Sequence, residues 1–540
     1  MLVQTIETTP FDDQQPGTSG LRKQVKVFSQ PHYLENFVQA IFNVVPELSG
    51  QTMVLGGDGR YFSKPAVETI LRLAAGNGVK RVILAAGGVI ATPAVSHLIR
   101  INKAAGGMLL TASHNPGGPD GDFGVKYNAA DGGSAPGKVM NAIYAETKKL
   151  SAYKLADLPL NAAMLEEPGL HDLGGFEIEI VDPVTAYADL MQAQFDFKII
   201  GKWLKTHSIL FDAMHGATGP AAVEILGNRL GVDAAHLMRC NPLEDFGGQS
   251  PDPNLVHAKQ LYDRMMGPDA PDFAAASDGD GDRNLIIGRN CYVSPSDSLA
   301  VLAANAKFIP AFANGLKGGA RSMPTSSALD RVAEKLGFDC YETPTGWKYF
   351  SELLEANRIS ICGEESAGTG GDHVREKDGL WAVLFWLNIL AARDLGVEGV
   401  MADHFASFGR TFHRRHDYEA LDTDIAHSLM ADLEKTLPAL IGQHDIISAD
   451  NYAYQSPVSG AVTKGQGLRI IGKNGSRMIF RLSGTGTTGA TLRLYLEQYS
   501  NDPAHYGLDV DEVLQPLAKL ADELAGISVR TGRAKPDVIT

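Results

Sequence analysis

Cysteine is scarce in this chain of 540 residues, and no two cysteines form a CxxC pair. The four cysteines lie far apart, at Cys240, Cys291, Cys340 and Cys362. This usage gives no sign of a disulfide framework and is typical of a long cytosolic protein. We therefore expect reduced, buried thiols.

Targeting and membrane signals are also missing from the sequence. The first residues, MLVQTIETTPFDDQQP, contain neither a basic segment nor an apolar segment of the kind found in signal peptides. The longest apolar stretch, at residues 380–392, is too short to span a bilayer and contains Asn388. We expect a soluble, cytoplasmic protein with no membrane partner.

Basic residues are outnumbered by acidic ones. Lys and Arg total 48 against 63 Asp and Glu, which gives a net charge of −15 with neutral histidine. Such a surface repels phosphate backbones and anionic lipids, so binding to nucleic acid is not expected. An anionic ligand would have to bind in a locally basic pocket.

Large cores are possible, because 44% of the residues are hydrophobic. A single core stops growing near about 250–300 residues, so we expect roughly two to five domains. Up to about residue 400, short apolar runs alternate with helical patterns, which indicates α/β architecture. The expected strands are 52–55, 81–86, 107–110, 208–212, 272–276, 338–341 and 358–362, and the expected helices are 64–77, 220–230, 326–336 and 347–355.

The pattern changes after about residue 400. Strand-like runs at 468–471, 477–482 and 490–495 precede a helix near 510–524, which favours a separate α+β domain. We expect four domains, with boundaries 1–185, 186–305, 306–404 and 405–540. Each of the first three delivers a glycine-containing polar loop from a strand end, and such loops could converge on one central cleft.

The sharpest motif is DGDGDR at residues 278–283, directly after the strand-like FAAAS. Three carboxylates at alternate positions can turn toward one point, and hard oxygen ligands suit Mg²⁺. A calcium EF-hand is excluded, because its sixth and twelfth positions would be Arg283 and Arg289. A haloacid-dehalogenase-type phosphatase is disfavoured by Asp282 at the fifth position, and a solvated acidic turn is the remaining alternative.

A second motif, TASHNPGG at 111–118, also follows an apolar strand. Ser113 could be a nucleophile, a helix cap or part of an ordinary turn. The absence of a G-x-S-x-G elbow around Ser113 leaves a Ser-His-Asp hydrolase without support.

Three further loops have polar, small-residue character. RLSGTGTTG at 481–489, followed by Arg493, indicates a phosphate loop, since backbone N–H groups and arginines can surround an oxyanion. PGTSGLR at 16–22, which contains Thr18 and Ser19, could bind phosphate in the same way or could form an ordinary turn. GEESAG at 363–368 offers carboxylates and a hydroxyl to sugar hydroxyls, or faces water as an acidic loop.

The order and spacing of these motifs resemble the α-D-phosphohexomutase superfamily. The segments PGTSGLRK, GDFGVKYN, YETPTGWK and HVREKDGLWAV resemble in particular its eukaryotic-type phosphoglucomutases. The resemblance extends from Pro16 to the final residues and implies three α/β domains of one topology, with a different fourth domain, around a central cleft. Ala367 and the stretch 411–418 depart from the pattern of this subgroup.

The resemblance also implies the catalytic residues. Ser113 matches the phosphoserine, and Asp278, Asp280 and Asp282, with an oxygen of phosphorylated Ser113, match the Mg²⁺ ligands. Arg283 would offset charge during transfer. Lys126 matches the proposed general base, which His373 or His114 could assist, and cations such as Arg22 could lower the pKa of a lysine base.

The implied substrate-binding residues form two groups. Those near the sugar are Thr345, Gly346, Glu364 and Ser366, with Arg22, Lys377, Thr18 and Ser19 as phosphosugar contacts. Those near a remote phosphate are Arg481, Ser483, Gly484, Thr485 and Arg493.

The activity implied is the reversible interconversion of glucose 1-phosphate and glucose 6-phosphate, with glucose 1,6-bisphosphate as intermediate and activator. A phosphomonoesterase acting on sugar phosphates and a catalytically silent sugar-phosphate-binding scaffold are the alternatives. We expect hexose phosphates as the partners of a monomer or weak homodimer.

Overall fold

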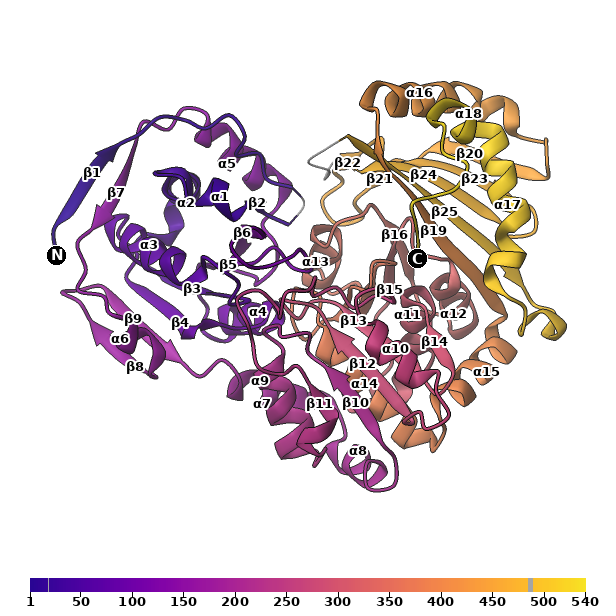
Figure 1. Cartoon of the computed structure of the whole chain (residues 1–540), viewed down its shortest axis with the longest axis horizontal. Helices are drawn as coiled ribbons and strands as arrows, with labels where there is room; N and C mark the ends of the chain where they lie inside the picture. The colour runs from indigo at the N-terminus through magenta and orange to yellow at the C-terminus, as the bar shows by residue number, and fades with distance from the viewer. Residues whose placement is uncertain (18, 484–488) are drawn as a thin grey trace. The chain divides into compact units, whose positions relative to one another are not determined.

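The computed structural model describes residues 1–17, 19–483 and 489–540. Contacts group the chain into two compact units, whose elements are labelled in Figure 1. Unit 1 comprises Met1–Pro295, Asn305–Lys317 and Gly346–Gly399. Unit 2 comprises Ser296–Ala304, Gly318–Thr345 and Val400–Thr540. The four expected domain boundaries stay a prediction.

Unit 1 contains a seven-stranded mixed sheet. Its four parallel strands are flanked by antiparallel strands on both edges. In spatial order the strands are β2 (Leu21–Gln24), β6 (Asp122–Ala129), β5 (Gly106–Leu110), β3 (Thr52–Gly57), β4 (Arg81–Val89), β9 (Glu177–Val181) and β8 (Gly169–Asp172). The predicted strands 52–55, 81–86 and 107–110 are confirmed, whereas β6 was not predicted.

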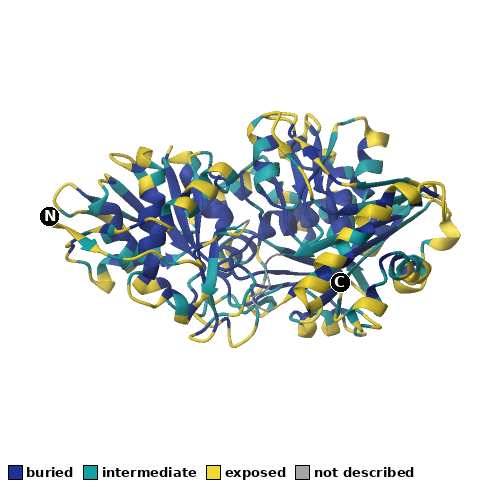
Figure 2. Ribbon diagram, turned by 90° about the horizontal axis from the view of Figure 1, so that it is seen from above, coloured by how far each residue is buried: buried dark blue, intermediate teal, exposed yellow. Residues whose placement is uncertain are grey.

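Helix α3 (Ser63–Gly76) confirms the helix expected at 64–77 and packs on β4. The apolar residues of α3 recur on one face of the helix and are buried. Ile70 and Leu71, for example, are 0% exposed. β5 is buried at every position, as expected for a central strand of a sheet covered on both faces. In Figure 2 the central strands of the sheets are coloured as buried, whereas the edge strand β8 is mostly exposed.

A second sheet of unit 1 has five strands. In spatial order they are β11 (Leu237–Met238), β10 (Ile209–Asp212), β12 (Phe273–Ser277), β13 (Asn284–Gly288) and β14 (Cys291–Val293). The single helix expected at 220–230 is instead a short α-helix, α9 (Gly219–Ala222), continued as a π-helix over Val223–Arg229. Widened helical turns of this kind are not visible in apolar periodicity, which distinguishes helix from strand only.

The hairpin β17 (Ile361–Gly363) and β18 (Thr369–Gly371) leads into α14 (Gly379–Arg393). α14 is apolar on all sides and is buried from Gly379 to Leu390, so the apolar stretch of the sequence is a core helix. In the part of the chain that the structure describes, no single helix is long and apolar enough to cross a membrane. α14 and α15 (Val397–Phe408) reach that threshold only as a pair bent by 84°.

Unit 2 is built on an antiparallel six-stranded sheet, on which α16 (Thr423–Leu440) and α17 (Val510–Ala525) pack. Its spatial order is β20 (Ile446–Asn451), β23 (Leu468–Gly472), β24 (Arg477–Ser483), β25 (Ala490–Ser500), β19 (Arg410–Leu421) and β26 (Val538–Ile539). The three strands and the helix predicted after residue 400 are confirmed. Asp509 caps α17 by accepting bonds from the backbone N–H groups of Asp511 and Glu512.

Unit 2 also contains the parallel strands β15 (Gly319–Ser322) and β16 (Cys340–Thr343) with α12 (Ala328–Leu336). The strand expected at 338–341 therefore begins two residues too early. Gly337 ends α12 in the left-handed region, with φ of 77°. The two residues after it lead from the helix into β16.

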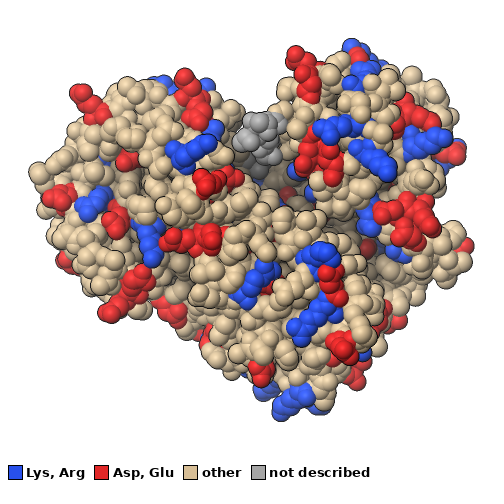
Figure 3. Space-filling model, viewed as in Figure 1, with Lys and Arg blue, Asp and Glu red and all other residues tan. Residues whose placement is uncertain are grey.

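The expectation for the cysteines is only partly correct. All four are free thiols, but only Cys362 is buried, while the other three have intermediate exposure. On the face drawn in Figure 3, acidic and basic side chains are interspersed.

Candidate active site

Ser113 lies immediately beyond the carboxyl end of β5 and is 1% exposed. Its Oγ donates a hydrogen bond to Asp278 Oδ2 at 2.8 Å, and its backbone N–H donates to Thr111 Oγ1 at 2.7 Å. Its φ of 54° lies in the left-handed region, which non-glycine residues rarely adopt. Local strain at a buried polar residue is typical of functional loops.

A buried ion pair supports this loop. Arg60 Nε contacts Asp58 Oδ2 at 2.9 Å, and both side chains are fully buried. The same guanidinium donates to the carbonyl oxygen of Ser113 at 2.7 Å and to that of Asp122 at 2.9 Å. This pair was not predicted from the sequence, although the glycine-rich segment GGDGR directly after a predicted strand is a signal for a functional loop.

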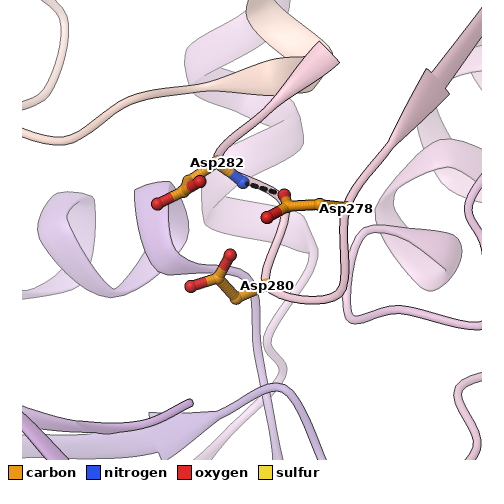
Figure 4. Close-up of side chains that lie close together, drawn as sticks. All are labelled: Asp278, Asp280 and Asp282. Carbon is orange, nitrogen blue, oxygen red and sulfur yellow. Dashed lines mark hydrogen bonds between the residues drawn. The ribbon is translucent and has the colours of Figure 1, made fainter. Parts of the chain in front are cut away.

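The three aspartates of DGDGDR converge, as Figure 4 shows. Their nearest carboxylate oxygens all lie within 4.8 Å of one another, and all three residues are buried. Asp278 Oδ1 accepts bonds from the backbone N–H groups of Asp282 at 2.8 Å and Arg283 at 2.9 Å. The turn depends on Gly281, whose φ is 80° and where a Cβ would lie 2.4 Å from Thr218 Oγ1.

These carboxylates fit a hard divalent cation. Asp280 Oδ1 and Asp282 Oδ1 are buried and have no hydrogen-bond partner among the described residues. Burial raises the pKa of Asp278 well above its usual value, and the neighbouring carboxylates of Asp280 and Asp282 raise it further. A cation among them would satisfy the unpartnered oxygens and relieve the repulsion.

The second oxygen of Asp280 belongs to a hydroxyl network. Asp280 Oδ2 accepts bonds from Thr92 Oγ1 and Thr111 Oγ1, each at 3.0 Å. Thr111 Oγ1 also lies 2.6 Å from Asp58 Oδ2. This network links the carboxylate cluster to the Asp58–Arg60 pair, and it could not be read from the sequence because its members lie far apart in the chain.

Cations surround the cluster. Lys377 Nζ lies 2.9 Å from Asp282 Oδ2. Burial lowers the pKa of this amine, but the carboxylates of Asp282, Glu364 and Asp280 together raise it above its usual value. Arg283 lies 3.5 Å from Asp252 Oδ1. Burial lowers the pKa of Arg22, whose Nε is buried without a partner among the described residues. The acidic chain therefore contains a locally basic site, as expected for a protein of this net charge that binds an anionic ligand.

The two histidines of the sequence prediction lie in different surroundings. His114 Nδ1 lies 3.4 Å from Ser113 Oγ, and burial lowers the pKa of His114 well below its usual value, with Arg283 and Arg22 contributing. His373 stacks on Trp381 with ring centroids 4.8 Å apart, and its Nε2 pairs with Asp378 Oδ2 at 2.9 Å. Its side chain has no exposed surface, and its assistance in proton transfer stays a prediction.

Lys126 lies on β6 and projects from the same face of the sheet as Arg22. The register pairs Arg22 with Gly124, so Arg22 and Lys126 are diagonal neighbours. A Cβ on Gly20 would lie 3.1 Å from Lys126 Cβ, which shows how closely the PGTSGLR loop approaches. The nearest charged group to Lys126 is nevertheless a carboxylate, since Nζ lies 2.7 Å from Glu376 Oε1. The sequence prediction named only cations such as Arg22 near this lysine, whereas the structure also places a carboxylate beside it.

The GEESAG loop connects β17 to β18. Glu364 Oε1 accepts a bond from the backbone N–H of Gly346 at 3.1 Å, and burial raises the pKa of Glu364. A Cβ on Gly368 would lie 2.4 Å from Lys377 Cδ, so this loop packs directly on Lys377. Ser366 and Ser19 have intermediate exposure, Thr345 belongs to unit 2, and Thr18 lies outside the described residues.

The predicted phosphate loop lies in unit 2, at the ends of β24 and β25. Arg481 and Arg493 are directly opposite each other in the antiparallel register, and both have intermediate exposure. Like charges in such positions repel unless an anion lies near them. Asp417 partly fills this role, with Oδ2 3.7 Å from Arg493 Nε. Ser483 is the last residue of β24, while Gly484 and Thr485 lie outside the described residues.

Family models match almost the whole chain. Phosphoglucomutase/phosphomannomutase α/β/α domains I, II and III match residues 13–154, 185–290 and 295–408. The C-terminal domain of phosphoglucomutase-1 matches residues 410–537. Three α/β/α domains followed by a different domain confirm the predicted fold class.

Individual relatives match over their full length or most of it. A phosphoglucomutase of Rhizobium radiobacter is 51% identical, with 100% of each chain covered. A chloroplastic phosphoglucomutase 1 of Marchantia polymorpha is 47% identical, over 100% of this chain and 85% of the relative. The solved structure of pp63/parafusin, a phosphoglucomutase from Paramecium, is 44% identical, with a TM-score of 0.93 over 100% of this chain and 99% of that one.

Proposed function

The chain belongs to the phosphoglucomutase/phosphomannomutase family, and we propose that it interconverts glucose 1-phosphate and glucose 6-phosphate with Ser113 as the phosphoryl carrier. The observation that carries this proposal is the hydrogen bond from Ser113 Oγ to Asp278, within a buried carboxylate cluster that retains unpartnered oxygens. A hydroxyl beside a cation site is the arrangement that phosphoryl transfer requires.

The reaction begins with phosphorylated Ser113. A free hydroxyl of the bound sugar phosphate attacks the phosphorus atom, the bond to Ser113 Oγ breaks, and glucose 1,6-bisphosphate forms. The bisphosphate then turns over so that its other phosphate faces Ser113, which takes that phosphoryl group back. Arg283 offsets charge during each transfer, and neutral His114 can accept a hydrogen bond beside Ser113.

Asp278, Asp280 and Asp282, with an oxygen of phosphorylated Ser113, would hold Mg²⁺. The ion would withdraw electron density from the phosphoryl group and so favour its transfer. Oxygen-only ligands in a small cluster favour Mg²⁺ over softer metals.

Two phosphate-binding positions follow from this reaction. The reacting phosphate lies at Ser113, while the other phosphate is bound by Arg481, Ser483, Gly484, Thr485 and Arg493. Glu364 and Ser366, with Thr345 and Gly346, bind the sugar hydroxyls. Arg22, Lys377, Thr18 and Ser19 contact the phosphosugar.

A coupled assay tests the proposal. With Mg²⁺ and a trace of glucose 1,6-bisphosphate, the full chain should convert glucose 1-phosphate to glucose 6-phosphate, and a chelator should stop the reaction. Release of inorganic phosphate faster than isomerisation would instead identify a phosphomonoesterase. Binding of hexose phosphate with neither reaction would identify a silent scaffold.

The remaining expectations rest on composition. The acidic surface supports hexose phosphates as partners over nucleic acid or membranes, and the subunit is expected to be a monomer or weak homodimer. A cytoplasmic location is also expected, although the relative from Marchantia polymorpha is described as chloroplastic. Sedimentation of the purified chain and microscopy of a tagged copy test these two points.

A further inference from the structure

Glu376 is a buried carboxylate with an unusual distribution of partners. Its Oε1 accepts bonds from Lys126 Nζ at 2.7 Å, Asn128 Nδ2 at 2.9 Å and Ser134 Oγ at 3.1 Å. Its Oε2 is buried and has no hydrogen-bond partner among the described residues. The residue is 0% exposed, so no solvent reaches it in this structure.

The neighbours of Glu376 in the chain bind elsewhere. Arg375 Nε pairs with Glu355 Oε2 at 2.7 Å, and Lys377 Nζ pairs with Asp282 Oδ2 at 2.9 Å. Within the described ranges, Lys126 is the one cation that forms an ion pair with Glu376. The segment Arg375–Asp378 therefore presents a dedicated carboxylate to the lysine on β6.

This pairing raises a chemical problem for a lysine base. An ammonium group has three donors and no acceptor, so it cannot take a proton from a sugar hydroxyl until it gives one away. The Glu376 carboxylate accepts a hydrogen bond from this group at 2.7 Å. It is also the nearest group that could accept the proton.

We propose that Glu376 is the final proton acceptor of the transfer and that Lys126 relays the proton to it. The proposal rests on the proposed mutase function. As the sugar oxygen attacks the phosphorus atom, its O–H bond breaks and a new N–H bond forms on Lys126. Another N–H bond of Lys126 breaks, and an O–H bond forms on Glu376.

The protons balance in this scheme once Ser113 is counted. When Ser113 Oγ leaves phosphorus in the first transfer it takes up one proton from solvent water, and when it attacks the other phosphate in the second transfer it gives that proton back to water. Lys126 is an ammonium before and after the step, and Glu376 changes from carboxylate to carboxylic acid. In the second transfer Glu376 returns the proton through Lys126 to the sugar oxygen that leaves phosphorus. Glu376 is thus a positioning residue that acts through Lys126 and does not touch the substrate.

The Glu376→Gln variant keeps the size and shape of the side chain but removes the carboxylate that would accept the proton. Glutamine keeps an oxygen that can accept the bond from Lys126, and its amide nitrogen replaces the oxygen that has no partner. We expect kcat to fall by about a hundredfold or more with little change in KM, since acid–base catalysis typically contributes that much. A kcat within about threefold of the wild-type value would overturn the proposal.

The Glu376→Asp variant tests whether another carboxylate restores part of the activity. Aspartate is shorter, yet it can accept a proton, so kcat should exceed that of Glu376→Gln by about tenfold. Equal losses in the two variants would indicate a purely structural role for the glutamate. Glu497→Gln is the matched control, because Glu497 is another buried, ion-paired glutamate, at 2% exposure. Its melting temperature should fall while kcat changes by less than about threefold.

A double-mutant cycle tests whether Glu376 acts through Lys126. In a Lys126→Met background, Glu376→Gln should cause no further loss of kcat. Multiplied losses would contradict the relay. The wild-type chain in the same assay keeps the two proposals distinguishable, since absence of mutase activity there would refute the proposed function before the relay is tested.

Discussion

The Ser113 loop in unit 1 and the Arg481–Arg493 pair in unit 2 are both predicted to bind phosphate, but they are built in opposite ways. Ser113 is 1% exposed and its hydrogen bonds lead to buried aspartates. Arg481 and Arg493 have intermediate exposure and face each other as like charges. The serine of the first region is held by buried hydrogen bonds before any ligand binds, whereas the second region is a pair of like charges that Asp417 neutralises only in part.

The difference matches the two tasks of a mutase. Transfer requires reacting atoms held in a fixed position, and buried hydrogen bonds supply that rigidity. The other site must accept a phosphate at either end of the sugar and release it, so charge with partial exposure is sufficient. Substitutions should therefore affect turnover and stability in the first region, and affinity in the second.

The largest effect is expected from Ser113→Ala. Without the phosphoryl carrier, turnover should fall at least about a thousandfold while substrate binding largely survives. Ser360→Ala is a suitable control, since Ser360 is another serine at 1% exposure and lies outside the site. Activity of the Ser113 variant close to that of this control would exclude the phosphoserine assignment.

Arg60→Met should cause the largest loss of stability. It leaves the buried carboxylate of Asp58 without its cation, and breaking such a pair typically costs about 3–5 kcal/mol. Denaturant unfolding of the full chain measures this loss. Arg60→Lys keeps the positive charge but loses the planar guanidinium group. Its free energy of unfolding should therefore lie between those of the wild type and of Arg60→Met. Unchanged unfolding of both variants would mean that the pair does not support the loop.

Asp280→Asn should weaken metal binding. A metal ligand is removed, and we expect metal affinity to fall by about a hundredfold. Mg²⁺ should raise the melting temperature of the wild-type chain, because it binds the folded state only. The same addition should raise that of the variant much less. A lower melting temperature with an unchanged response to Mg²⁺ would identify a structural turn instead.

Arg493→Ala should have the smallest of these effects. One charge-assisted contact worth roughly 1.5–3 kcal/mol is lost, so kcat/KM should drop by about ten- to a hundredfold, largely through KM. Stability should change little, because the lost repulsion with Arg481 offsets the lost contact with Asp417. Arg530→Ala removes an exposed, ion-paired arginine of the same unit and should leave KM unchanged. Loss of Mg²⁺ binding with normal affinity for phosphosugars would show that the phosphate loop was assigned wrongly.

Local patterns explain what could be predicted from the sequence. The aspartates of DGDGDR are two residues apart, so alternate positions on one turn already bring their carboxylates together. Strands such as β3 and β5 are continuous apolar runs, as central strands of α/β sheets usually are. Helix α3 could be predicted as well, because its apolar residues recur with helical spacing.

Long-range contacts explain what could not. Lys126 and Glu376 are separated by 250 positions, and nothing near either residue indicates the other. Thr111 reaches Asp280 across 169 positions. The burial of His373 follows from its stacking on Trp381, which sequence motifs do not show. The carboxylate loop was therefore readable, while the network that positions it required the fold.

The most direct test of the account is to locate the phosphoryl group. The purified chain should be incubated with glucose 1,6-bisphosphate and Mg²⁺, digested and analysed by mass spectrometry, before and after addition of excess glucose 1-phosphate. The account predicts one phosphoryl group on the peptide that contains Ser113. When that group carries an isotopic label and the bisphosphate is removed first, added glucose 1-phosphate should transfer the label from Ser113 to hexose phosphate without releasing it as inorganic phosphate. A stable phosphoryl group on another residue, or mutase turnover with Ser113 unmodified throughout, would contradict it.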